Sequence, residues 1–77
     1  MTITLHKTVA ERGIELRDKD GGELWFTITP PTFQPGASRH KWQIEYKREG
    51  KMLVHRCWYS LEAAEFACLA IYAEAKN

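Results

Sequence analysis

The stretch of sequence that decides the fold runs from Trp42 to Tyr59 and reads WQIEYKREGKMLVHRCWY. Apolar and polar residues alternate in its first five positions, which is the period of a strand with one buried face. Glu49 and Gly50 interrupt this pattern, and a glycine lets the backbone turn sharply. We therefore expect an antiparallel hairpin whose second strand covers residues 52–59.

The pattern becomes helical directly after this hairpin. Ser60 is a good N-cap, and Glu62 and Glu65 lie where the positive end of a helix dipole favours carboxylates. Alanine-rich sequence continues the helix to about Ala75. One apolar stripe repeats at helical spacing and comprises Leu61, Ala64, Cys68, Ile71, Tyr72 and Ala75.

The N-terminal half carries strand patterns separated by turn signals. A turn or bend is expected over residues 9–13, and two glycines in residues 18–22 permit the next turn. Pro30 and Pro31 end the last of these strands, because proline cannot donate to a ladder. Three further strands are therefore predicted, over residues 2–8, 13–18 and 24–29.

Strands followed by one helix indicate an α+β protein, an antiparallel sheet of four to five strands with one C-terminal helix packed on one face. The 77 residues are 44% hydrophobic and we expect a single domain over residues 1–77. One core of this size leaves little room for a deep enzyme cleft. No glycine-rich phosphate loop exists, and the His and Cys spacing matches no zinc pattern. We expect neither an enzyme nor a protein with a cofactor or metal.

Three further expectations concern the environment of the chain. The N-terminus lacks an apolar run of signal-peptide length and no stretch is long enough to span a bilayer, so we expect a cytoplasmic protein without a membrane partner. Cys57 and Cys68 are expected to be small buried hydrophobes rather than a disulfide. The long connection from Pro30 to Arg39 is either functional or a stiff crossover pinned by Phe33.

The turn at Glu49 and Gly50 fixes an expected register in which Trp42 faces Cys57. The core face then carries Trp42, Ile44, Tyr46, Leu53, His55 and Cys57. On the first strands Ile14, Leu16, Leu24, Phe26 and Ile28 share a face, with Trp25 on the other. A register error of one residue would exchange the two faces.

The face away from the helix is the predicted partner site. Exposed aromatic residues together with arginine are typical of interface centres. The alternative is that lysine and arginine stems simply pack over cross-strand rings. The predicted partner-binding residues are Trp25, Lys41, Gln43, Lys47, Met52, Arg56 and Trp58.

The helix and the last hairpin suggest two other contacts. Phe66 and Leu69 lie off the apolar stripe, so either the sheet curls round the helix or the helix contacts a second chain in a homodimer. Residues 39–59 hold six basic and two acidic residues, a net charge of +4, on a chain whose total is +1. Such a patch suits phosphates or an acidic protein surface.

Residues 41–75 resemble the three-strand-plus-helix DNA-binding domains of plant transcription factors and of phage integrase arm-binding domains. The resemblance rests on a tryptophan-containing strand, a Gly-Lys turn, a basic strand, and Ser-Leu-Glu-Ala-Ala at the start of the helix. It implies that the sheet enters the major groove, with the helix behind it. The chain departs from these families in its near-neutral charge and in the apolar Met52, Val54 and Trp58 on the same face. The contacts that the resemblance implies are Lys41, Gln43, Lys47 and Arg56.

In size and architecture the chain also resembles small phage-encoded inhibitors such as anti-CRISPR proteins. The leading hypothesis is a small protein-binding module, an inhibitor or adaptor of the mobile-element kind, acting through an aromatic and basic sheet face. The alternative is a nucleic-acid-binding domain that uses the basic hairpin 39–59.

Overall fold

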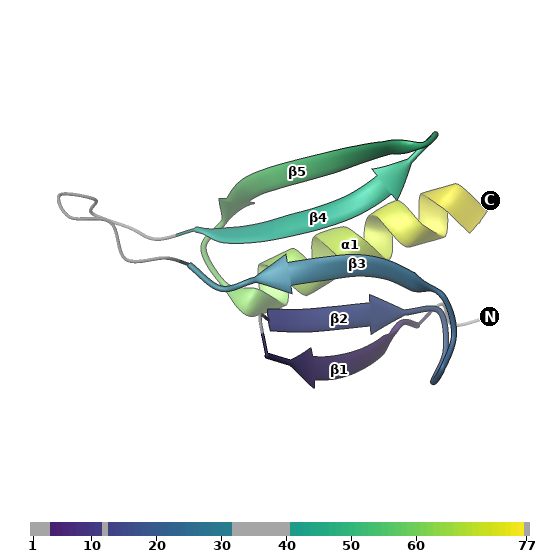
Figure 1. Cartoon of the computed structure of the whole chain (residues 1–77). Helices are drawn as coiled ribbons and strands as arrows, with labels where there is room; N and C mark the ends of the chain where they lie inside the picture. Colours follow the sequence, from purple (N-terminus) through teal and green to yellow (C-terminus); the bar gives the residue numbers. More distant parts are fainter. Residues whose placement is uncertain (1–3, 12, 32–40, 77) are drawn as a thin grey trace, which may run out of the picture.

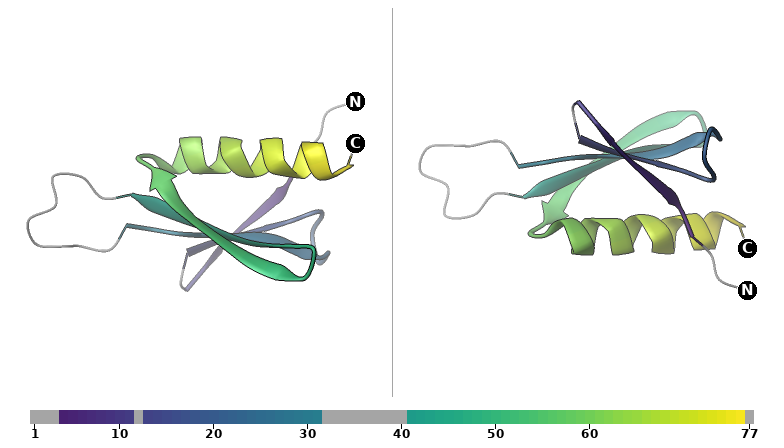
Figure 2. Two further views of the ribbon diagram at one scale, coloured as in Figure 1. Left: turned by 90° about the horizontal axis from the view of Figure 1, so that it is seen from above. Right: turned by 90° about the horizontal axis from the view of Figure 1, so that it is seen from below.

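A computed structural model describes residues 4–11, 13–31 and 41–76 of the chain, with the backbone alone for Cys57. The five strands form one antiparallel sheet in chain order, and the helix lies across one face of it (Figures 1 and 2). The predicted α+β architecture is therefore confirmed. The elements are β1 (His6–Ala10), β2 (Gly13–Arg17), β3 (Leu24–Thr29), β4 (Trp42–Arg48), β5 (Lys51–Trp58) and α1 (Leu61–Lys76).

The turn between β4 and β5 confirms the predicted hairpin. Glu49 and Gly50 both have positive φ, at 53° and 77°, as the two central residues of a type I′ turn require. This turn type matches the right-handed twist of the flanking strands. The turn places Arg48 opposite Lys51.

The core is a layer between the sheet and the helix. Ile28 of β3 pairs with Ile44 of β4 at the centre of the sheet, and neither is exposed at all. The predicted helical stripe supplies the opposing surface, while Ser60 caps the helix by accepting a 3.1 Å hydrogen bond from the backbone N–H of Ala63. The buried residues of the core are Ile14, Leu16, Phe26, Ile28, Ile44, Ala64, Cys68 and Tyr72.

Strand β1 differs from its predicted position. It runs from His6 to Ala10, so the bend expected over residues 9–13 is wrong for Val9 and Ala10. The reason is that Ala10 pairs with Gly13 across only two residues, which keeps the chain extended up to the turn. Residues 2 and 3 of the predicted strand and most of the connection from Pro30 to Arg39 lie outside the described residues.

The helix α1 is amphipathic rather than uniformly apolar. Within the part of the chain that the structure describes, no helix is long and apolar enough to cross a membrane.

The central isoleucine pair provides a test of where the core lies. Ile44→Ala should lower the free energy of unfolding by about 3 kcal/mol, because it removes a fully buried side chain and leaves a cavity. Val9→Ala removes methyl groups from a residue that is 80% exposed, so it should cost less than about 0.5 kcal/mol. Urea denaturation measures both changes, and equal effects would contradict the assignment of the core.

The buried thiol of Cys68 gives a second test. Burial, with a smaller contribution from the Glu65 carboxylate, raises the pKa of this thiol from 9.0 to about 12. At about pH 8 the native thiol is therefore protonated and shielded, and iodoacetamide should modify it only after unfolding. Mass spectrometry of the peptide containing Cys68 measures this protection.

The same shift makes stability depend on pH. Above pH 9.0 the unfolded thiol loses its proton while the folded thiol keeps it up to about pH 12. The free energy of unfolding should therefore fall as the pH rises through this window. Cys68→Ala should lack this part of the pH dependence, and an unchanged profile in that variant would contradict the burial of the thiol.

Candidate functional site

The candidate site is the sheet face away from α1, which we call the open face. Cross-strand pairing connects its members across the sheet, from Glu15 to Thr27, Glu45 and Val54 in one row. None of the described segments lies on top of it (Figure 2). From β2 to β5 it comprises Glu15, Arg17, Leu24, Thr27, Thr29, Gln43, Glu45, Lys47, Met52, Val54 and Arg56.

A polar ladder crosses the open face on β4 and β5. Arg56 donates two hydrogen bonds to the Gln43 Oε1 atom, at 3.1 Å from Nε and 2.7 Å from Nη2. Gln43 in turn donates from Nε2 to Glu45 Oε1 at 2.8 Å. The guanidinium of Arg56 is thus held across from β5 to β4, and its charge lies in one network with a carboxylate.

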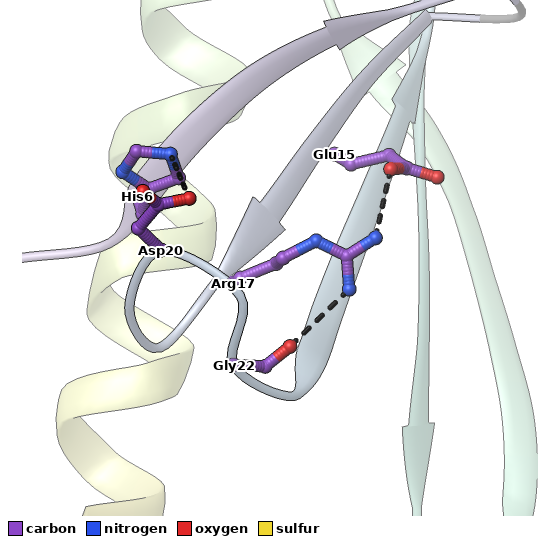
Figure 3. Close-up of polar contacts among 5 residues, drawn as sticks. All are labelled: His6, Glu15, Arg17, Asp20 and Gly22. Atoms are coloured by element: carbon purple, nitrogen blue, oxygen red, sulfur yellow. Dashed lines mark hydrogen bonds and ion pairs between the residues drawn. The ribbon is translucent and has the colours of Figure 1, made fainter.

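A second polar cluster anchors the opposite side of the face (Figure 3). Arg17 donates to Glu15 Oε1 at 3.0 Å and to the carbonyl of Gly22 at 3.3 Å. The arginine therefore fixes the turn before β3 as well as pairing with a neighbour on its own strand. His6 lies 3.6 Å from Asp20 beside this cluster.

Apolar side chains interrupt these polar groups. Met52 is 56% exposed and Val54 is 52% exposed on β5, while Leu24 is 42% exposed on β3. Large exposed apolar side chains near one another, bordered by polar groups, are typical of a surface that binds a partner.

A pocket lies between the exposed leucine and methionine. β3 and β4 pair only where residues 27–29 face residues 43–45, and beyond that point the two strands diverge (Figure 1). The pocket has a volume of about 500 Å³, enough for one large side chain of a partner. Its lining combines apolar, aromatic and charged groups from Glu23, Leu24, Trp25, Phe26, Thr27, Glu45, Tyr46, Lys47 and Met52.

The predicted orientation of Trp25 is wrong. The register of β2 and β3 shifts so that Arg17 pairs with Leu24 and Leu16 with Phe26, which leaves Trp25 as the extra residue of a β-bulge. The bulge turns the indole towards the helix, where its ring centroid lies 4.7 Å from that of Tyr72. The same shift moves Leu24 from the expected core face to the open face.

The predicted orientation of Trp58 is wrong for the same physical reason. Cys57 has no partner in the ladder because Gln43 pairs with Arg56 and Trp42 with Trp58, so the expected pair of Trp42 with Cys57 does not form. The bulge places Trp58 on the helix side, packed against the core, with its ring 6.4 Å from the His55 ring.

The remaining predicted residues occupy several places. Gln43, Lys47, Met52 and Arg56 lie together on the open face, as expected. Lys41 precedes β4, and its amine lies 5.5 Å from the centre of the Tyr59 ring.

The two helix residues predicted to contact a second chain have different surroundings. Phe66 is 76% exposed. Leu69 is half-buried and lines a smaller pocket of about 280 Å³ between the helix and the N-terminal segment.

The capacity of the described residues to bind a metal ion is a separate question. Among the described residues, no three histidine, cysteine or acidic side chains form a group that would hold a metal ion. Comparison with protein-family models, with curated proteins and with solved structures gives no match. The open face is therefore the feature of this structure that bears on function.

The corrected orientations of the tryptophans can be tested by stability. Trp58→Ala should lower the free energy of unfolding by about 2 kcal/mol, because the ring packs against the core. Met52→Ala on the open face should change it by less than about 0.5 kcal/mol. Thermal or urea unfolding of both variants measures the difference. An unchanged free energy of unfolding in Trp58→Ala would contradict the packing of this ring on the helix side.

Proposed function

We propose that this protein is a protein-binding module that acts through the open face. The observation that carries the proposal is the pocket of about 500 Å³ with Leu24 and Met52 at its rim and exposed Val54 beside it. Protein interfaces concentrate their binding energy where one partner inserts a large side chain into such a pocket, surrounded by polar contacts.

The charge of the open face favours a protein over a nucleic acid. The face holds three basic residues, Arg17, Lys47 and Arg56, and two acidic ones, Glu15 and Glu45. The two arginines are already hydrogen-bonded to neighbours on the face. Affinity for nucleic acid depends on how many phosphates lysine and arginine neutralise, and the net charge of this face is only +1, so the implied insertion of this face into a DNA groove has weaker support.

The proposal needs no chemistry beyond binding. A small inhibitor or adaptor acts by covering a surface of its target, and 77 residues suffice for that. We include in the proposal the role suggested by the likeness to small phage-encoded inhibitors, because a single open face with a pocket is suited to it.

Capture of binding proteins by a surface variant tests the proposal. Immobilised wild-type protein should retain a defined set of proteins from a lysate of the source cells, both with and without nuclease treatment. Met52→Glu should lose that set, because a carboxylate at the pocket rim cannot enter an apolar contact without a desolvation cost. Mass spectrometry identifies the retained proteins, and circular dichroism checks that the variant is folded.

Val9→Glu is the matched control for this experiment. It places the same new charge on an exposed apolar residue of the same sheet, on β1 and away from the open face. Retention by wild-type and Val9→Glu with loss by Met52→Glu supports the proposal. Equal retention by all three proteins contradicts it, and retention that disappears with nuclease favours the nucleic-acid hypothesis.

A further inference from the structure

One edge of the sheet is formed by β5. It is the longest of the described strands, with eight residues, and β4 is its one ladder partner among the residues that the structure describes. Figure 2 looks onto this edge in its left view, where the helix lies on one face of the sheet and not along the outer side of the hairpin. A row of unpaired backbone groups at a sheet edge is a template for another strand.

The hairpin turn determines which backbone groups face outwards. A two-residue type I′ turn is closed by a hydrogen-bonded pair, here Arg48 and Lys51. Hydrogen-bonded and non-hydrogen-bonded pairs then alternate along an antiparallel ladder. The N–H and C=O groups of Met52, Val54 and Arg56 therefore point away from β4, and these are the residues whose side chains lie on the open face.

The side chains along this edge define what would fit beside it. Lys51 and Arg56 stand near the two ends of the strand, with the apolar Met52, Leu53 and Val54 and the exposed His55 between them. Among the described residues Lys51 forms no ion pair. A strand added here would place apolar side chains beside the middle of β5 and carboxylates beside its ends.

The charges of the hairpin disfavour a second copy of the chain as the added strand. Residues 41–59 carry five basic and two acidic residues, and pairing two such hairpins brings like charges together. Lysine on an edge strand is a known protection against self-pairing. The same lysine attracts an acidic strand.

The opposite edge offers a poorer template. β1 has five residues, and two of its charged or titratable side chains are already engaged, Lys7 with Glu65 at 3.0 Å and His6 with Asp20 at 3.6 Å. An incoming strand at this edge would find fewer backbone groups and no free complementary charge.

We infer that β5 binds an extended acidic segment of a protein partner by strand addition, so that the partner continues the sheet beside Val54. This inference rests on the proposed protein-binding function and adds the backbone edge through which the partner is held. The added strand extends the open face, because its alternate side chains lie beside Met52, Val54 and Arg56.

A synthetic peptide provides the first test. The probe is Glu-Val-Thr-Val-Thr-Val-Glu, and the control is the same peptide with lysine at both ends. Added to the 77-residue protein, the glutamate peptide should slow amide hydrogen exchange at Met52, Val54 and Arg56 but not at Val9 on the other edge. The lysine peptide should bind several-fold more weakly, because one of its ends opposes Lys51, which forms no ion pair among the described residues.

A proline at the edge provides the second test. Val54→Pro removes an outward N–H and leaves the β4–β5 ladder intact, as proline on an edge strand allows. It should weaken peptide binding about tenfold, while Val54→Thr, which keeps the N–H, should bind like wild type. Exchange protection of the amides in β3 verifies that both variants are folded.

The possible outcomes separate the two proposals. Unprotected β5 amides with the glutamate peptide, or equal binding by Val54→Pro and Val54→Thr, would overturn strand addition. If Val54→Pro still captures the proteins that Met52→Glu loses, the open face binds a partner without the edge. Concentration-dependent dimers that Val54→Pro abolishes would instead make the second copy the added strand and overturn the acidic segment.

Discussion

In the part of the chain that the structure describes, one helix covers one face of a five-stranded sheet and leaves the other face uncovered. The rest of the structure depends on this constraint. Ile28 and Ile44 pair at the centre of the sheet and are completely buried, beneath a helix whose Ala64 and Cys68 are also completely buried. Small residues on the helix let it approach the sheet closely. Because the described residues supply one helix for two sheet faces, the second face is stabilised by its own side chains.

The open face meets that requirement with flat polar networks. The chain of hydrogen bonds from Arg56 through Gln43 to Glu45, and the pairing of Arg17 with Glu15, satisfy charged groups on the surface of the sheet. These contacts leave few free charges on the face, and they leave Met52 and Val54 as its projecting apolar groups. The same arrangement that makes a one-sided sheet stable therefore leaves a surface suited to a protein partner.

Two β-bulges determine how the aromatic residues are divided between the faces. Trp25 and Trp58 would both lie on the open face in a regular ladder, but each stands at a bulge and packs on the helix side. The bulges add aromatic surface to a small core, which a domain of this size needs. They also exchange Leu24 for Trp25 on the open face, where the divergence of β3 and β4 forms the pocket.

The sequence by itself determined the α+β class, the Glu49–Gly50 turn, the capped helix and the register next to the turn. These features depend on local periodicity and on residues with special backbone preferences, so neighbouring positions suffice to predict them. The tertiary structure alone decided the orientation of Trp25 and Trp58, the length of β1 and the pocket between β3 and β4. A bulge exchanges the faces of the side chains on one side of it, as it does for Leu24 and Trp58, and in both cases the displaced ring packs on the helix side of the sheet, a contact that strand periodicity does not contain.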